Sequence, residues 1–577
     1  MVGALLALGS GCKKESQAQP EVAVAATNNS APKTEPAKPA SPALKLHWLG
    51  KKHLAADTNA NYFVTIWNLP ESARLQAQTL DKLSLWFAGL TNTSAPEPPA
   101  PTGTNAAATT SLGGPTNLDT IVAGNPTAST LRPLLEDLVD SESYCELRAE
   151  TNGNSEFTLA IRLDDQRASA WQAAQDAFKA AQTARRLPTG AITLKRAGAW
   201  TLFSIAPTNL PDAGTTATEF ASRIQSHPSG TPFTPGPTNY WLETDFDVQT
   251  LADAFCPAAR SKGGTNSISA SVPLPKIWLS VNGEEQSVRT RAELEFLQPL
   301  NLDLEPWNIP TNIIHDPLVS FTAIRGFRPW LQKLKAWQDL HIASTPNQAY
   351  LWSMAGMPIL DFAAVPATDA SNIVARLGAN IMQWANPWLA THEFGQVARS
   401  TNFDGIAWTG APFVSPQLRS LTATNGNWVV GTLVPLLKNG RVVPPELTSA
   451  VSDRTNLVSY QWELTGVKVE QLTYVSQLIR LISQRAQIPP NSASFQWLKS
   501  AEPKLGNCVT IATSEDPKHV TVIRRSSAGF SAVELHTLAD WLESPHFPVG
   551  LHSGLEPRPA PVRRARPGGA KPTSGNK

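Results

Sequence analysis

The sequence predicts an α+β fold in two halves, each an antiparallel or mixed sheet with amphipathic helices packed on it. In the stretch 456–485, apolar and polar residues alternate from 458 to 465, which is typical of a strand with one buried face. From 472 to 482 the apolar residues recur instead at the spacing of one helical stripe. The same order of strand, tight turn and helix is predicted for three further stretches, 61–83, 239–255 and 317–337.

The order of the predicted elements repeats along the chain, which is the second observation behind this fold class. Residues 44–305 are expected to form a first half, interrupted at 91–118 by a low-complexity insertion. A segment with two prolines near residue 306 marks the boundary, and residues 306–550 are expected to follow the same plan as a second half. The repeat starts are unevenly spaced, so an internal duplication is predicted rather than a short-period solenoid.

Composition and charge bound the class of protein. The chain has 577 residues, of which 41% are hydrophobic and 16% charged, and its net charge is +1. This composition is globular, and a net charge so close to zero gives no general field that would attract a nucleic acid. No apolar run reaches the roughly 18 residues that a membrane-spanning helix needs, so no transmembrane bundle is predicted.

The N-terminal residues carry a specific resemblance. Residues 1–12, MVGALLALGSGC, form a short run of small and apolar residues that ends in Cys12 and is followed at once by two lysines. They resemble the signal peptide of bacterial lipoproteins, in which the cysteine after a small residue is lipidated. Gly9 stands where that family usually has Leu, and no Lys or Arg precedes the apolar run. The resemblance implies export and a lipid on Cys12 that anchors the protein to a bacterial membrane, facing the periplasm or the exterior.

Two polar segments flank the predicted body. Residues 13–43 are rich in Pro, Ala, Lys and Glu and are expected to be a disordered tether. Residues 551–577 are expected to be a disordered basic tail. The tail is interpreted as solvated, with binding to anionic envelope polymers or lipid head groups as the alternative.

The sequence contains no motif that assigns a catalytic, cofactor or metal site. It lacks a GxSxG nucleophile elbow, a phosphate loop, a GxGxxG turn, an HExxH helix and a C-x-x-C pair. The histidines are scattered, so neither a metal nor a cofactor is predicted. If Cys12 is lipidated, Cys145, Cys256 and Cys508 remain, and we expect three buried free thiols, with one bridge such as Cys145 to Cys256 as the alternative.

The best candidate for a binding site is the polar face of a repeated strand. In 239–255, Trp241, Glu243 and Asp245 are expected on the face opposite Leu242 and its apolar neighbours. A tryptophan beside two carboxylates on an exposed face can stack on a sugar ring and bind its hydroxyls. Glu463 occupies the matching face of the last copy, so the carboxylates of the two halves could approach one another. The competing interpretation is that Trp241 belongs to the core and that the carboxylates are solvated or cap the next helix.

Tryptophans on the predicted helices are interpreted as packing residues, because they lie on apolar stripes. They are Trp171, Trp330, Trp337, Trp384 and Trp388.

Three functions follow as hypotheses. The first is a non-enzymatic envelope lipoprotein that binds or scaffolds a polysaccharide or another envelope protein. The second is a glycan hydrolase with Glu243 and Glu463 on either side of a cleft. The third is a folding or assembly factor that offers a sheet edge to client strands.

Overall fold

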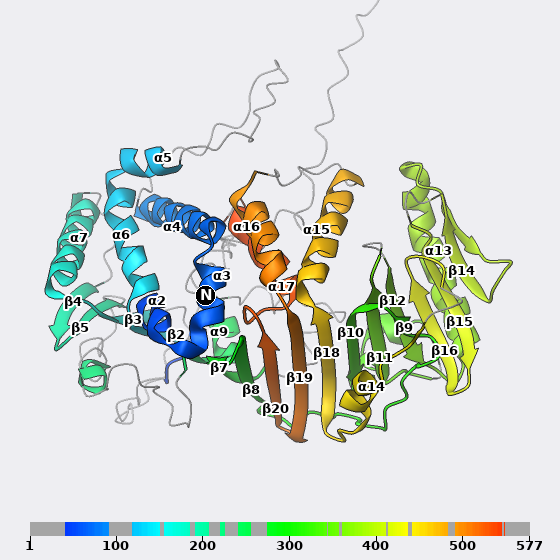
Figure 1. Ribbon diagram of the computed structural model, residues 1–577. Coiled ribbons are helices and arrows are strands. Elements are labelled where there is room, and N and C mark those ends of the chain that lie inside the picture. Colours follow the sequence, from blue (N-terminus) through cyan, green and yellow to red (C-terminus); the bar gives the residue numbers. More distant parts are fainter. Residues whose placement is uncertain are drawn as a thin grey trace, which may run out of the picture.

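The computed structural model describes residues 41–91, 118–149, 155–184, 191–206, 220–225, 240–255, 274–342, 344–356, 360–410, 414–436, 441–482, 491–544 and 547–548. They form one long curved sheet with most of the helices on a single face (Figure 1), which confirms the α+β class. The predicted signal peptide, nearly all of the tether and of the insertion, and the basic tail lie outside the described residues.

Eighteen strands of the described chain join this sheet, and every pairing is antiparallel. The pairings run in the order β4, β5, β3, β2, β1, β6, β7, β8, β20, β19, β18, β10, β11, β12, β16, β15, β14 and β13. The strands up to residue 295 are β1 (Leu44–Trp48), β2 (Ser143–Ala149), β3 (Ser155–Arg162), β4 (Ala191–Ala197), β5 (Trp200–Ala206), β6 (Leu242–Asp247), β7 (Lys276–Glu284) and β8 (Ser287–Glu295). The others are β10 (Leu318–Arg325), β11 (Gln348–Met354), β12 (Asp361–Pro366), β13 (Gln396–Arg399), β14 (Gly405–Thr409), β15 (Gln417–Ala423), β16 (Gly426–Thr432), β18 (Leu457–Leu464), β19 (Asn507–Asp516) and β20 (His519–Ser526).

The larger helices cover one face of the sheet. They are α4 (Pro70–Thr91), α6 (Pro126–Asp140), α7 (Asp165–Ala184), α13 (Ala370–Thr391), α15 (Thr465–Ile482), α16 (Ala493–Ala501) and α17 (Ala532–Glu543). Leu46 and Leu159 of the sheet pack against Leu134 of α6 and Trp171 of α7. At the other end of the sheet, Val374 of α13 packs in the same way on the sheet. Short helices α2 (Lys51–Ala56) and α3 (Asn61–Trp67) lie on this side as well, and α5 (Leu118–Gly124) packs with α4 and α6.

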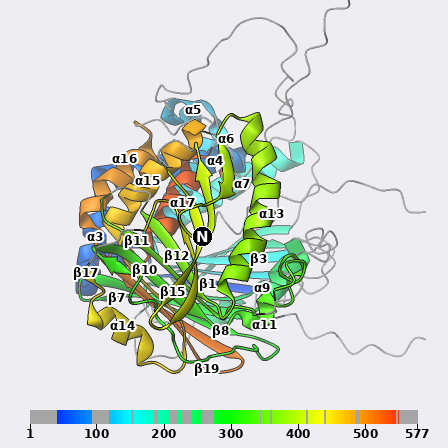
Figure 2. The same cartoon turned by 90° about the vertical axis from the view of Figure 1, so that its right-hand side faces the viewer.

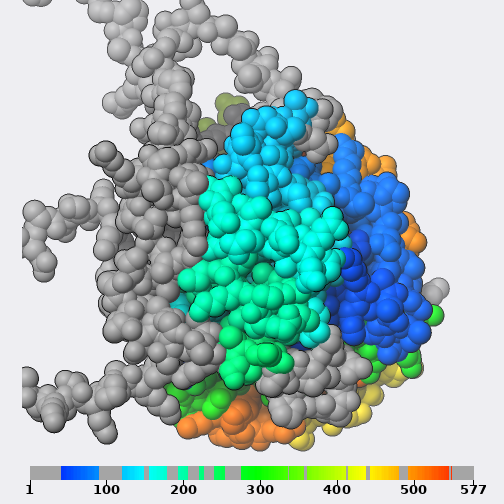
Figure 3. Space-filling view, turned by 90° about the vertical axis from the view of Figure 1, so that its left-hand side faces the viewer, coloured from blue at the N-terminus to red at the C-terminus, as the bar shows by residue number. Residues whose placement is uncertain are grey.

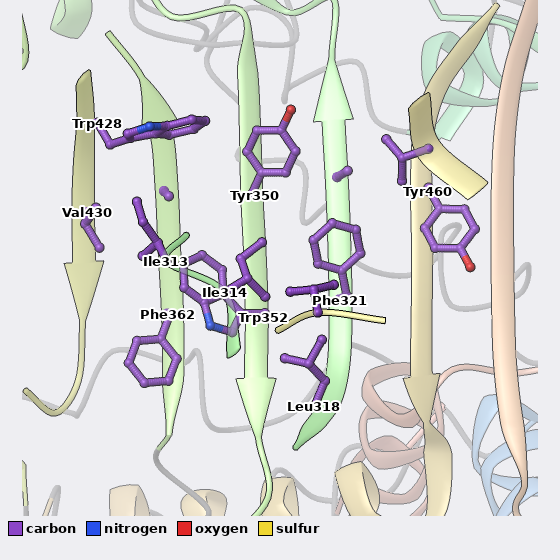
Figure 4. Packing of buried hydrophobic residues seen from close by; sticks show 14 of the residues in the cluster. Ile313, Ile314, Leu318, Phe321, Tyr350, Trp352, Phe362, Trp428, Val430 and Tyr460 are labelled. Carbon is purple, nitrogen blue, oxygen red and sulfur yellow. The ribbon is translucent and has the colours of Figure 1, made fainter. Parts of the chain in front are cut away.

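The opposite face carries a second core in the later part of the chain. Aromatic side chains from adjacent strands point to the same side and stack in a row (Figure 4), among them Trp428, Tyr350 and Phe321. Helix α14 (Pro445–Ser452) and the segment 307–314 cover them. Because the two faces of a strand alternate, this row and the helices above the sheet use different residues of the same strands.

Strands β8 and β20 join the two parts of the sheet. They pair antiparallel at eight positions, from Val288 opposite Ser526 to Glu295 opposite His519. Arg525 of β20 reaches Glu284 of β7 with Nε 2.7 Å from Oε2, and this contact holds the pKa of the Glu284 carboxyl below its ordinary value. Residues 44–295 and 318–526 therefore meet in a continuous ladder of hydrogen bonds.

The predicted strand in 61–83 is wrong, because that stretch consists of two helices joined by a two-residue turn. Helix α3 is followed by α4, which begins at Pro70, where the missing amide donor costs nothing. Tyr62, Ile66 and Leu69 recur at helical spacing and pack against Val469 of α15 and its neighbours. The other three stretches do contain a strand followed by a helix: β6 and α9 (Val248–Phe255), β10 and α11 (Arg328–Leu331), and β18 and α15.

Two of the three remaining cysteines lie in the described chain, and both are buried free thiols, as expected. Burial raises the pKa of Cys145 and of Cys508 to about 12, so neither is a thiolate at neutral pH. Cys256 lies outside the described residues.

Truncating the aromatic row should destabilise the protein strongly. Trp428 is completely buried, so Trp428→Ala is expected to lower the free energy of unfolding by about 3–5 kcal/mol through lost burial and a residual cavity. The matched change Trp384→Ala, at an indole that is 82% exposed, is expected to stay within about 0.5 kcal/mol of the wild type. Denaturant unfolding measures both, and equal losses would contradict the assigned core.

Candidate functional site

Trp241 is a core residue, as the competing interpretation of this strand expected, and it does not lie on an exposed strand face. Its side chain is 2% exposed, and its Nε1 donates a hydrogen bond to Asp57 Oδ2 at 2.7 Å. The ring stacks on Phe63 of α3, with 5.8 Å between centroids. The physical reason is that β6 begins only at Leu242, so Trp241 does not follow the alternation of the strand and turns toward the helices.

Glu243 is also buried, and it belongs to a chain of charged groups inside the protein. Its Oε1 lies 3.2 Å from Nδ1 of His47, and the Nε2 of the same ring lies 3.2 Å from Oε1 of Glu142. Glu142 Oε2 in turn lies 3.0 Å from Nε of Arg162. Two carboxylates and two basic groups alternate in this chain, so the buried charges are compensated when His47 is protonated.

The charge of His47 depends on two opposing effects. Burial disfavours the imidazolium, but hydrogen bonds and attraction from Glu142 and Glu243 favour it more, so the pKa of His47 is raised above its ordinary value. His47 therefore binds a proton more tightly in the folded protein than in the unfolded chain, which makes the stability of the fold depend on pH.

The remaining two predicted site residues lie apart from this chain. Asp245 is half exposed and pairs with Lys45, with Nζ 3.4 Å from Oδ2. Glu463 is 2% exposed, and its Oε1 accepts a hydrogen bond of 2.6 Å from the amide of Ala532, the first residue of α17. Burial raises the pKa of Glu463. Glu463 thus contacts the N-terminus of α17, where a carboxylate is favourable, and this is not the helix that follows its own strand.

Glu243 and Glu463 do not converge. Cross-strand partners point to the same face, and the register from β6 through β7, β8, β20 and β19 to β18 places Glu243 on the face of Tyr460. Glu463 is three residues further along β18 and points to the opposite face. Five ladder steps of about 4.8 Å also separate the two strands by roughly 24 Å. No shared site between these carboxylates exists in the structure.

A second polar cluster fastens α15 to the sheet. Lys468 of α15 binds Ser353 of β11 and pairs with Asp361 of β12, with Nζ 2.9 Å from Oδ1. Ser353 also donates to Asp361 and accepts from Ser320 at 3.0 Å. These groups satisfy one another beneath the helix, so the cluster fixes α15 against the sheet.

One cavity of about 310 Å³ is lined by residues of α2, α6 and α7. These helices lie at the end of the molecule that Figure 3 faces, where they are coloured blue to turquoise. Four carboxylates line the cavity together with four basic groups, and Glu142 of the buried chain is among them. Arg167 is already paired with Asp137, with Nη2 2.7 Å from Oδ2. Because acidic and basic groups are equal in number and Arg162 pairs with Glu142 as well, the cavity does not favour a cation or an anion.

The end of the sheet that carries β13 to β16 has an exposed aromatic surface. Helix α13 runs along this end of the molecule (Figure 2), and its Trp384 and Trp388 are 82% and 52% exposed. The Trp388 ring stacks on His392, with 4.5 Å between centroids, and lies 5.9 Å from Phe394. We call these four residues the aromatic cluster.

The aromatic cluster is held by the elements beneath it. The side chain of Asn386 accepts a hydrogen bond from the amide of Val397 at 2.8 Å and donates one to its carbonyl at 3.0 Å, so it completes the outer edge of β13. Trp408 of β14 donates its Nε1 hydrogen to the carbonyl of Phe394 at 2.7 Å. Leu389 is buried against Val397 below the helix. A rigid scaffold therefore presents the exposed rings, which lowers the entropy lost on binding.

The interpretation of Trp384 and Trp388 as packing residues is wrong. Two stripes of α13 were available to the sheet. The predicted stripe is buried at its start, at Ile373, but toward the C-terminal end of α13 the structure buries the stripe through Gly378 and Leu389, about 100° around the helix from the tryptophans. The sequence feature that could have identified the buried face is this second stripe, because it contains the small residue Gly378. Gly378 lies so close to Ile406 that a Cβ at this position would be 2.9 Å from Cγ2 of Ile406.

Comparison with protein-family models, curated proteins and solved structures finds no match to this chain. Within the described residues, no group of three or more His, Cys, Asp or Glu side chains is placed to hold a metal ion. Over the same residues, no helix has both the length and the apolar character needed to cross a membrane.

The buried chain predicts a pH dependence of stability. Because the folded-state pKa of His47 is raised, its contribution is complete below the unfolded value of about 6.5 and is lost as pH rises through the folded value. The wild type should lose stability over this range, and His47→Gln should lose less. Chemical unfolding from pH 6 to 9 measures this, and the same slope in both proteins would contradict it.

Proposed function

We propose that the protein is an exported lipoprotein, anchored through a lipid on Cys12, whose folded body is a non-enzymatic binding or scaffolding protein of the cell envelope. The apolar residues before Cys12 and the polar residues 13–43 support the anchor and the tether. The location follows from the same residues: a bacterial membrane, with the body in the periplasm or outside the cell.

The aromatic cluster is the observation that carries the binding role. Large aromatic side chains are rarely left exposed side by side, and such residues dominate the energy of many interfaces. Trp384 and Trp388 are one helical turn apart on a helix that is fixed to the sheet by Asn386. This arrangement suits recognition of a partner, because stacked aromatic rings offer a flat apolar contact surface.

An internal duplication, proposed here for the two halves, supports the scaffolding role. The order β4, β5, β3, β2, β1, β6, β7, β8 corresponds strand by strand to β15, β16, β12, β11, β10, β18, β19, β20. Strands β13 and β14 are an addition to the second half, and they carry the aromatic cluster with α13. Two copies of one plan that share a sheet make a long support, with the proposed binding surface at one end.

The two alternative functions have less support. A glycan hydrolase that uses Glu243 and Glu463 needs them within roughly 10 Å across a cleft, whereas the register separates them on opposite faces. An assembly factor needs an open strand edge. At β13, Asn386 already occupies the outward amide and carbonyl of Val397, so among the described strands such an edge is left at β4, at the end of the sheet away from the aromatic cluster.

Replacing the lipid-bearing residue should release the protein from the membrane. Cys12→Ser removes the thiol that would be acylated, so the protein is expected to move from the membrane pellet to the soluble fraction of the host. Fractionation with detection of the folded body measures this. Metabolic labelling with a fatty acid is the control, and a labelled Cys12→Ser protein would contradict the assignment.

The aromatic cluster should determine retention on envelope material. In a sedimentation assay with isolated envelopes, the double variant Trp384→Ala and Trp388→Ala is expected to bind at least about tenfold more weakly, since truncated interface tryptophans often cost 2 kcal/mol or more. Tyr474→Ala, an exposed aromatic on α15, is the matched control and should bind like the wild type. Equal retention of all three proteins would contradict the proposed binding role.

A further inference from the structure

We propose that the aromatic cluster binds an uncharged glycan chain that lies along α13. This inference rests on the proposed binding role and names its ligand. It depends on the charge, the polar rim and the geometry of the surface.

The segment that carries the aromatic cluster has almost no charge. Between Arg376 and Arg399 the sequence contains a single charged residue, Glu393. A partner recognised by its charge, such as a nucleic acid or an anionic lipid head group, requires lysines or arginines next to the aromatic rings. Their absence from this segment favours a ligand that is itself uncharged.

The rim of the cluster offers neutral hydrogen-bonding groups. Asn380 and Gln383 are exposed on α13 within one helical turn of Trp384. An amide side chain supplies both donors and an acceptor, which matches hydroxyl groups that also do both. A sugar ring combines such hydroxyls with an apolar face of C–H groups, and that face packs on an indole. Aromatic rings bordered by amides therefore suit a sugar as the ligand. A site for an aliphatic protein surface would be expected to have apolar side chains around the rings instead.

The geometry favours a chain over a single sugar. Asn380, Trp384, Trp388 and His392 follow one another at intervals of four residues, so each is about 6 Å further along the helix axis. All four are exposed. The stacking of Trp388 on His392, and of His392 on Phe394 at 6.1 Å, limits the movement of these rings. An elongated ligand can contact two indoles and the polar groups at both ends of this stripe at once.

The test uses the purified full chain and two uncharged probes, the tetrasaccharides of β-1,4-linked N-acetylglucosamine and of β-1,4-linked glucose, titrated by calorimetry. We expect the wild type to bind at least one. Trp384→Ala and Trp388→Ala should each weaken binding at least about tenfold, while Trp384→Phe keeps a ring and should lose less. Tyr474→Ala should bind like the wild type, and unchanged thermal unfolding of each variant excludes misfolding as the cause.

The outcomes separate this inference from the proposed function. If the wild type binds neither sugar, or if both alanine variants bind as well as the wild type, the glycan inference is overturned. Retention on envelopes that still depends on Trp384 and Trp388 would in that case leave the binding role standing. Tryptophan-dependent sedimentation with neutral phosphatidylcholine vesicles, without sugar binding, would assign the surface to a membrane and also overturn the inference. If the wild type neither is retained on envelopes nor binds a sugar, both proposals are overturned.

Discussion

The antiparallel pairing of β8 with β20 is the interaction on which the rest of the structure depends. Without it the chain would consist of two sheets, one made by residues up to 295 and one by those from 318 onward. With it, hydrogen bonds continue from β4 at one end to β13 at the other, and two strands that would otherwise be open edges are closed. Val288 and Ser526 at this junction are almost completely buried, so it is part of the interior.

The two sides of the sheet are used differently along its length. On the side that carries the helices, the rung Phe246, Leu44, Leu147, Phe157 is apolar in the first half. On the same side of the later strands, the rung Glu463, Ser320, Ser353, Asp361 is polar. On the opposite side the first half holds the buried chain around His47, and the second half holds the aromatic row around Trp428. Polar groups and aromatic packing thus change sides between the two parts of the sheet. The buried carboxylates of Glu142, Glu243 and Glu463 each have a partner that compensates their burial.

The sequence predicted most of what depends on local periodicity. Alternation identified β18, β10 and β6, and a stripe of apolar residues identified α7 and α15. It failed at 61–83, where the apolar residues fit both the alternation of a strand and the stripe of a helix. Which of the two patterns is buried depends on helices from a distant part of the chain, such as α15, that pack against this stretch. It also failed at Trp384, since α13 has two apolar stripes and the choice between them depends on how closely Gly378 approaches Ile406. The burial of Glu243 could not be predicted, because its partner His47 comes from a strand almost two hundred residues earlier.

Amide hydrogen exchange at the junction tests most directly whether the halves share one sheet. The backbone amides of β8 and β20 should be as strongly protected as those of β10 and β11 in the middle of the second half, because all four strands are paired on both sides. Strand β4, which pairs only with β5 among the described strands, should exchange faster and serves as the internal reference. Protection of β8 and β20 no greater than that of β4 would show that the halves separate in solution, and the continuous sheet would then be wrong.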